Sequence, residues 1–293
     1  MKKLAFLSMD PKELEAFYVY DELLFEPFAQ LGYAISTVSW HDAEHDYSQY
    51  EAVIVRTPWD YQQHESAFVA CLQRIASQTL LVNSLQLMLW NLNKVYLKDL
   101  ASSGVAVLPT LWFDAFDEET VADAFGHFQS NEIVIKPCVS ANADDTYRLT
   151  PETLPAHIPE LTRCFAQRSF MLQPFVTSVV EYGEVSLFYF AGELSHAILK
   201  RPKAGDFRVQ EEHGGSLQVI TPDTAMLKNA EAALAAMPDD YLYARVDLLM
   251  FAEQWRIIEL ELIEPSLYFN LAPQSPTRFV TGYQRYLAGL TQC

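Results

Sequence analysis

Glycine and cysteine are scarce in this chain of 293 residues, which has ten glycines and four cysteines. Neither the phosphate loop GxxxxGK[ST] nor the dinucleotide fingerprint GxGxxG occurs, so both of these phosphate-binding motifs are excluded. The cysteines are scattered, without CxxC or another metal-ligand spacing, at Cys71, Cys138, Cys164 and Cys293. This usage argues against a structural zinc site and favours a reduced, cytoplasmic protein.

Positive charge is also scarce, with 20 basic against 38 acidic residues and a net charge of −18. Such a surface disfavours non-specific binding to nucleic acid or to anionic membranes, so we expect neither partner. No apolar run reaches membrane-spanning length, and the opening MKKLAFLSMDP is expected to form a strand, not a signal peptide. Half of the residues are hydrophobic, which predicts two or three folded domains with sizeable cores.

Strands and helices alternate in the first part of the chain, which predicts a parallel α/β sheet. The expected strands are residues 4–8, 33–39, 52–56 and 80–82, and the expected helices are residues 12–30 and 65–76. In open sheets of this type, ligands bind at the carboxyl ends of the strands.

The segment RTPWDY directly follows one of these strands and is a candidate substrate site. Arg56 could hold a carboxylate or phosphate through its planar guanidinium group, and Trp59 and Tyr61 could wall a pocket. The alternative is an ordinary loop in which Arg56 pairs with Asp60. Asp10, at the end of the first strand, is a weaker candidate.

Two lysines further on are candidates for binding an anion. A helix expected over residues 92–102 would carry Lys94 and Lys98 on one face. Lys136 closes an apolar strand just before a proline, and a buried ammonium group needs an anionic partner. The following loop, residues 138–149, could fold over phosphates with its backbone N–H groups.

The middle of the chain provides further candidates for nucleotide contacts. Residues 170–176 form an expected strand broken by Pro174, where free backbone groups could meet an adenine edge. Residues 184–190 and 193–201 are expected to form a hairpin that ends in Lys200 and Arg201. The polar segment 206–215, which contains Arg208, resembles a mobile loop that returns to the site.

A second hairpin, over residues 244–263, concentrates carboxylates on one face. With a short turn around residues 252–254, Asp247 lies opposite Glu259 and Arg245 opposite Glu261. Crowded carboxylates repel one another, and Mg²⁺ prefers oxygen ligands of this kind. The alternative is a solvated face with an ordinary Arg–Glu pair, because a register slip of one residue would turn the acids to the other side.

This order of motifs resembles the ATP-grasp superfamily over residues 83–270. The chain is most similar to a group that includes O-ureido-D-serine cyclo-ligase, and more distantly similar to bacterial glutathione synthetase. The motifs that carry the resemblance are Arg56-x-x-Trp59-Asp60-Tyr61, Trp90-Asn91-x-x-Lys94-x-Tyr96-Leu97, Ile135-Lys136-Pro137, Arg245-x-Asp247 and Glu259-Leu-Glu261-Leu-Ile-Glu264-Pro265. The resemblance implies two α+β subdomains that clasp ATP, here residues 93–178 and 179–293, after an α/β domain of residues 1–92.

The resemblance also implies roles for single residues. Nucleotide contacts are expected from Lys94, Lys136, Gln173, Pro174, Phe175, Val176, Glu184 and Lys200. The expected metal ligands, for two Mg²⁺ ions or for Mn²⁺ in their place, are Asp247, Glu259 and Glu261. Glu261 stands where the superfamily usually has asparagine, which adds one negative charge. Arg208 and Arg245 are the expected catalytic arginines, and the expected substrate contacts are Arg56, Trp59, Asp60 and Arg201.

The activity implied is that of an ATP- and Mg-dependent carboxylate–amine ligase with an acyl-phosphate intermediate and a small amino-acid-like substrate. The reaction could be an intramolecular ring closure or the joining of two molecules, as in a glutathione synthetase-type peptide ligase. A kinase that stops at phosphorylation and a non-catalytic nucleotide-binding protein are the other hypotheses. Many members of the superfamily are homodimers, so the resemblance leaves a homodimer open.

Overall fold

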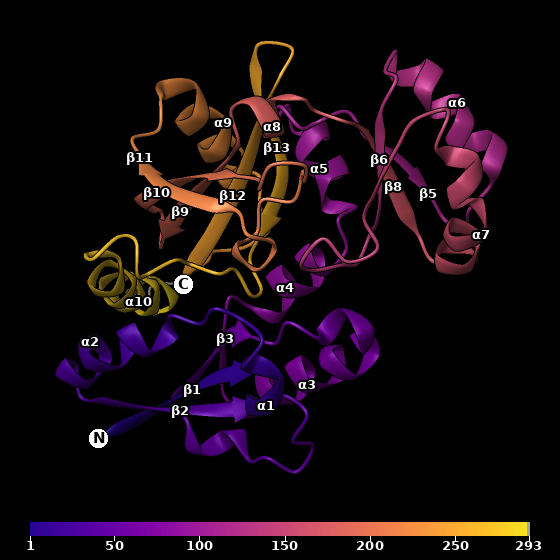
Figure 1. Ribbon diagram of the computed structural model, residues 1–293. Coiled ribbons are helices and arrows are strands. Elements are labelled where there is room, and N and C mark those ends of the chain that lie inside the picture. The colour runs from indigo at the N-terminus through magenta and orange to yellow at the C-terminus, as the bar shows by residue number, and fades with distance from the viewer. Residues whose placement is uncertain (292–293) are drawn as a thin grey trace.

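The computed structural model describes residues 1–291 and contains three β-sheets that follow one another along the chain (Figure 1). Their strand orders are β2-β1-β3-β4, β5-β8-β6-β7 and β11-β10-β9-β12-β13. This mixed architecture confirms the expected combination of a parallel α/β sheet with α+β units. Within residues 1–291, no helix combines the length and the apolar character needed to cross a membrane.

The first sheet is parallel, and apolar side chains fill the strands that lie at its centre. Its strands are β1 (Lys2–Ser8), β2 (Tyr33–Ser39), β3 (Ala52–Thr57) and β4 (Leu80–Val82). The helices around it are α1 (Pro11–Leu14), α2 (Phe25–Gln30) and α3 (Glu65–Gln78), with 3-10 turns at Asp21–Leu24, Tyr47–Gln49 and Tyr61–Gln63.

The second sheet is antiparallel and has a small core of its own. It is reached through α4 (Leu85–Leu92) and α5 (Tyr96–Ser102). Its elements are β5 (Leu111–Phe113), α6 (Glu118–Phe128), β6 (Ile133–Pro137), β7 (Tyr147–Leu149), α7 (Leu154–Phe165) and β8 (Phe170–Pro174).

The third sheet is also antiparallel and carries most of the charged residues singled out above. Its strands are β9 (Glu184–Phe190), β10 (Glu193–Arg201), β11 (Ser216–Ile220), β12 (Tyr243–Phe251) and β13 (Gln254–Glu261). Its helices are α8 (Ser178–Glu181), α9 (Thr224–Ala235) and α10 (Ser275–Leu290), with a 3-10 turn at Glu211–His213. We propose that the three sheets mark structural units with the expected boundaries near residues 92 and 178.

The C-terminal helix packs back onto the first unit. The rings of Phe28 in α2 and Tyr283 in α10 meet edge to face, 5.4 Å apart. One buried apolar cluster joins residues of the first sheet, the third sheet and α10, whereas the core of the second unit is built only from residues of that unit. The first and third units therefore share one apolar core, and the second unit packs against the third through α5 and the end of β8.

Two expected helices differ from those observed. The helix expected over residues 12–30 is broken into three short helical segments, and the bend brings Asp21 to a buried ion pair with Arg56. The helix expected over residues 92–102 begins only at Tyr96. Lys94 consequently lies in the turn between α4 and α5, so Lys94 and Lys98 do not share one helical face.

Candidate active site

A cavity lies where the three units meet, and its volume is about 1560 Å³ with the solvent at its mouth included. The walls come from the loop after β3, the α4–α5 turn, β6, β8 and strands β9, β10, β12 and β13. Segments that are far apart in the sequence therefore contribute side chains to one space, as expected for a binding site at the junction of structural units.

The hairpin of β12 and β13 forms one wall and has the predicted register at its polar end. Arg245 pairs with Glu261 and Asp247 pairs with Glu259, so all four side chains lie on one face. The turn has two residues, Ala252 and Glu253, both with positive φ, instead of the three that we expected. A β-bulge next to Asp247 compensates for the missing residue. The bulge therefore places the carboxylates in the register that the longer turn would have given.

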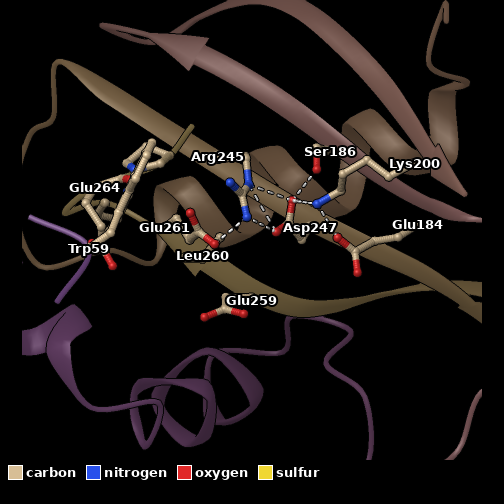
Figure 2. A network of polar contacts seen from close by, with 12 residues as sticks. Trp59, Glu184, Ser186, Lys200, Arg245, Asp247, Glu259, Leu260, Glu261 and Glu264 are labelled. Carbon is tan, nitrogen blue, oxygen red and sulfur yellow. Dashed lines mark hydrogen bonds and ion pairs between the residues drawn. The ribbon is translucent and has the colours of Figure 1, made fainter. Parts of the chain in front are cut away.

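A continuous network of charges crosses the third sheet (Figure 2). Arg245 Nη2 lies 2.8 Å from Asp247 Oδ2 and also contacts Glu261, while Ser186 donates a 2.5 Å hydrogen bond to Asp247. Lys200 Nζ contacts Glu184 and lies 3.6 Å from Asp247 Oδ1. Burial alone would raise the pKa of Asp247, but Arg245 and Lys200 hold that pKa at about 2. Asp247 is therefore ionised at neutral pH.

Glu261 has the opposite balance. Burial raises its pKa above the usual range and the charge of Arg245 opposes this effect, but the nearby carboxylates of Glu259 and Asp247 raise the pKa further. Glu261 shares the Arg245 guanidinium group with Asp247, so one cation contacts two carboxylates, and Glu259 lies beside them. A divalent cation with oxygen ligands would relieve this repulsion, so the residues fit a magnesium site.

Lys94 faces the same hairpin from the α4–α5 turn. The Asn91 amide bonds the backbone of Leu260 and Leu262, and the Tyr96 hydroxyl bonds both backbone groups of Leu260. These bonds fix the turn against β13. They place Lys94 Nζ 3.0 Å from Glu259 Oε1 and 2.8 Å from the Ser140 carbonyl oxygen.

Lys136, at the end of β6, lines the same cavity but is not paired. Within residues 1–291 its ammonium group makes no ion pair and no side-chain hydrogen bond. Burial lowers its pKa, while Glu259 raises it and Lys94 lowers it. A cation in this position gains most from an anionic ligand that enters the cavity.

An apolar cluster forms another part of the cavity wall. Leu108, Phe175, Val176, Leu249 and Ile258 are buried together there, next to the end of β8. The Gln173 amide donates a 2.9 Å hydrogen bond to Thr110, which fixes the side chain at this edge. Flat apolar walls beside a strand end suit an aromatic base.

Both loops that were expected to cover the site line the cavity. Ser140, Asn142 and Thr146 come from residues 138–149, and Phe207 and Gln210 come from residues 202–215. Each loop also contacts the first unit. The Gln62 amide donates to Asp144 at 3.1 Å, and the Tyr20 hydroxyl donates to both carboxylate oxygens of Glu211 at 3.1 and 3.2 Å. The loops are therefore held over the cavity from the N-terminal side.

Glu264 lies in the cavity wall just after β13. Its residue is 8% exposed, and the Trp59 indole donates a 2.9 Å hydrogen bond to its backbone carbonyl oxygen. Burial raises the pKa of its carboxyl group to about 7, whereas a polar contact with the Tyr61 hydroxyl lowers it. Figure 2 shows Glu264 and Trp59 on one side of the charge network, with Lys200 and Glu184 on the other.

Comparison with known proteins identifies the group to which this site belongs. The family model for the N-terminal domain of D-cycloserine synthetase DcsG matches residues 4–83. The cycloserine biosynthesis protein DcsG of Streptomyces lavendulae is 31% identical over 278 residues, which cover 87% of this chain and 90% of that protein. The chain belongs to the DcsG family of ATP-grasp ligases.

Solved structures agree with this assignment. The crystal structure of D-cycloserine synthetase DcsG superposes with a TM-score of 0.84 at 29% identity, covering 97% of this chain and 99% of that one. An ATP-grasp RimK domain protein from Sphaerobacter thermophilus gives a TM-score of 0.72 at 15% identity, with 96% and 98% covered. D-alanine–D-alanine ligase from Bacillus anthracis, in complex with ATP, gives 0.66 at 13% identity, with 96% of each chain covered. The last two show the shared fold. This DcsG-family chain is thus an ATP-dependent ligase.

Most of the residues singled out in the sequence of this DcsG-family chain line the one cavity. They are Trp59, Lys94, Lys136, Gln173, Pro174, Phe175, Val176, Glu184, Lys200, Arg208, Arg245, Asp247, Glu259 and Glu261. Arg208 points to a local partner in this structure, because its guanidinium group binds Asp206 Oδ2 at 2.8 Å.

Three expected substrate contacts lie elsewhere. Arg56 is 1% exposed, pairs with Asp21 at 3.0 Å and donates to the Pro265 carbonyl oxygen, so it joins the first unit to the segment after β13. Asp60 holds Trp40 and His41 outside the main cavity. Arg201 contacts Gln218 on the neighbouring strand. None of the three lines the cavity, and we leave them out of the proposed substrate site.

Sequence reasoning gave no role to several residues that complete the site. Ser140 accepts a hydrogen bond from Lys94, and Ser186 donates one to Asp247. Isolated serines of this kind carry no signal in a single sequence. Tyr61 was expected only as a pocket wall. Glu264 could have been noticed in the sequence, because the pair Glu264-Pro265 directly follows the acidic hairpin. Its contact with the Tyr61 hydroxyl could not be predicted from the sequence.

Proposed function

We propose that this ligase joins a carboxylate to a nitrogen nucleophile through an acyl phosphate, on a small amino-acid-like substrate. The DcsG relatives are named for cycloserine synthesis, so ring closure within one molecule is the reaction that we favour. The residues that we propose for the site are those expected from the sequence that also line the cavity, as given in the preceding subsection. Joining of two molecules, as in a glutathione synthetase-type ligase, is the alternative that the test below separates.

The observation that carries this proposal is that carboxylates and lysines line one cavity together, where Lys94 and Lys200 form ion pairs and Lys136 faces the same space. Glu259 forms an ion pair with Lys94, which the resemblance assigns to phosphate binding, and Asp247 forms one with Lys200, which is an expected nucleotide contact. Phosphoryl transfer depends on positioning and charge neutralisation more than on a covalent protein group. The cavity provides both kinds of charge and contains no Ser–His or Cys–His pair.

Magnesium completes the proposed site. Asp247, Glu259 and Glu261 are the residues that would hold it, with two ions proposed and Mn²⁺ as a substitute. When bound, the ions would neutralise phosphate charge while the carboxylate nucleophile approaches.

The chain's own residues act in two steps. A substrate carboxylate oxygen forms a bond to the γ-phosphorus of ATP as the bond to the bridging oxygen breaks, and Lys94 and Lys136 hold the phosphates. The nitrogen nucleophile then bonds the acyl carbon, loses its proton and releases phosphate. Arg245, fixed by Asp247 and Glu261, presents positive charge beside the reacting oxygens. The loops of residues 138–149 and 202–215 exclude water from the acyl phosphate.

The test is phosphate release from Mg·ATP with a panel of amino acids and serine derivatives, including O-ureido-D-serine, followed by mass spectrometry. Release that depends on one acid supports the ligase, and the product mass distinguishes ring closure from joining of two molecules. The variant Glu259→Gln should lose turnover by about 100-fold or more while it stays folded. Glu253→Gln, in the exposed β12–β13 turn, removes the same charge and should not change turnover.

A phosphorylated acid that accumulates without any condensation would support a kinase. Binding of Mg·ATP without turnover on any acid would overturn the proposed substrate class. In either case the assignment to the family stands, because it rests on the sequence and fold.

A further inference from the structure

Five buried or partly buried carboxylates line the cavity, and one differs from the others. Glu184, Asp247, Glu259 and Glu261 each contact a lysine or arginine of the chain. Within the part of the chain that the structure describes, Glu264 makes no ion pair, although its residue is 8% exposed. A buried carboxylate with no cation beside it is costly, which points to a cation that arrives from outside.

The position of Glu264 indicates which ligand brings this cation. Lys200 and Glu184, two of the expected nucleotide contacts, lie across the charge network from Glu264 (Figure 2). Glu264 lies beyond the proposed metal ligands, beside Trp59 and Tyr61 of the first unit. A group at this end meets the molecule that attacks the γ-phosphate, not the nucleotide.

The surroundings of Glu264 suit a small ammonium group. The Trp59 indole fixes the backbone of residue 264 from one side, and Tyr61 is 4% exposed beside the carboxyl group. Aromatic rings and a carboxylate together provide a favourable environment for an organic cation. A third metal ion would require several oxygen ligands, whereas among the described residues the direct polar contacts of Glu264 are those with Tyr61 and Trp59.

We propose that Glu264, with Tyr61 and Trp59, forms a subsite that binds the ammonium group of an α-amino acid substrate. This inference rests on the proposed function and adds a specificity element to it. The ammonium group would form an ion pair with the carboxylate and remain protonated, so that it does not compete with the nitrogen that attacks the acyl phosphate. The subsite would also orient the neighbouring substrate carboxylate towards Arg245 and the γ-phosphate.

The test compares each amino acid with the same acid lacking the amine. Suitable pairs are D-serine with 3-hydroxypropanoate, and O-ureido-D-serine with its deaminated counterpart. We expect the wild-type protein to prefer the amine-bearing acid by about 10- to 100-fold in kcat/KM, the range for a hydrogen-bonded ion pair. Glu264→Gln should remove most of this preference by raising the KM of the amine-bearing acid only. Tyr61→Phe should remove part of it.

Two controls make the result specific. Glu253→Gln removes one exposed charge and should keep the preference. The affinity for Mg·ADP should be equal in wild type and Glu264→Gln. If Glu264→Gln weakens Mg·ADP binding or slows both acids of a pair equally, Glu264 belongs to the metal or structural framework and the inference is wrong.

A binding measurement separates this inference from the proposed function. Calorimetric titration of the same acids into the protein with Mg·AMPPNP reports the amine preference without turnover. Amine-dependent binding that Glu264→Gln abolishes supports the subsite even if no acid releases phosphate. Turnover without an amine preference would overturn the subsite and leave the ligase function intact.

Discussion

Lys94 and Glu259 form an ion pair with 3.0 Å between Nζ and Oε1, although the proposed mechanism assigns them to different ligands. Lys94 would bind a phosphate and Glu259 a metal ion. When Mg·ATP binds, the ion pair must break and each partner gains a charge of the opposite sign from the ligand. The pair therefore neutralises two functional groups until the nucleotide replaces both contacts.

This pairing predicts how the two residues depend on one another. Lys94→Met leaves Glu259 buried without its partner, so the free energy of unfolding should fall by about 1–3 kcal/mol. The double variant Lys94→Met/Glu259→Gln should recover most of that stability but no turnover. Urea unfolding and phosphate release measure the two properties. Lys98→Met, on the exposed face of α5, is the control. It should change the free energy of unfolding and the rate of phosphate release only slightly.

Lys136 should behave in the opposite way, because within residues 1–291 it has no ion-pair partner and burial lowers its pKa. Lys136→Met should leave the free energy of unfolding unchanged or raise it, since an ammonium group without an ion-pair partner is removed from a partly buried place. The same variant should weaken ATP binding by about 10- to 100-fold, measured by titration calorimetry. A loss of stability equal to that of Lys94→Met would contradict this account.

The contact between Tyr20 and Glu211 predicts an effect on water exclusion. Tyr20→Phe removes the hydroxyl that holds the loop of residues 202–215 against the first unit. The loop should open more often, so hydrolysis of the acyl phosphate should compete with ligation. The ratio of phosphate released to ligated product should rise severalfold. Tyr18→Phe alters an exposed tyrosine nearby and should keep the wild-type ratio.

His196 predicts part of the pH dependence of stability. Burial lowers the pKa of this histidine to about 4, and its ring stacks on Phe188 at 4.3 Å. The unfolded chain binds a proton below the ordinary pKa of 6.5, whereas the folded chain does so only near pH 4. Stability is therefore lost as pH falls between these values, by about 2 kcal/mol at pH 5 from this group.

The variant His196→Gln isolates this contribution. Its free energy of unfolding should decrease less than that of wild type between pH 7 and pH 5. His127→Gln, at an exposed position of α6, should retain the wild-type slope. Equal slopes for wild type and His196→Gln would show that the buried ring is not the titrating group.

The acidic hairpin shows how far a single sequence leads. The alternation of apolar and polar residues placed Asp247 and Arg245 on one face, and an assumed three-residue turn placed them opposite Glu259 and Glu261. The turn length was wrong by one residue, and the register was still right because a bulge next to Asp247 restores it. A periodic pattern fixes which side chains share a face, whereas turn and bulge depend on backbone conformations that the pattern does not reveal.

Long-range contacts set the limits of prediction. Lys94 was expected on a helix, but its backbone N–H donates to the Cys138 carbonyl oxygen at 2.8 Å, and this contact forms only when the second unit packs nearby. Arg56 was expected to bind substrate, yet Asp21, 35 residues earlier, takes its guanidinium group. Local propensity favours a continuous helix around Asp21, and the buried ion pair overrides it.

The packing of α10 onto the first unit has a consequence for nucleotide exchange. Phe28 and Tyr283 belong to an apolar cluster that joins the first and third sheets, while the second sheet keeps a separate core with α6 and α7. We therefore expect the second sheet, together with α6 and α7, to move relative to the rest of the protein, with hinges near residues 103 and 176. ADP would leave when this part of the protein moves away, while the hairpin of β12 and β13 and the proposed subsite at Glu264 keep their positions relative to one another.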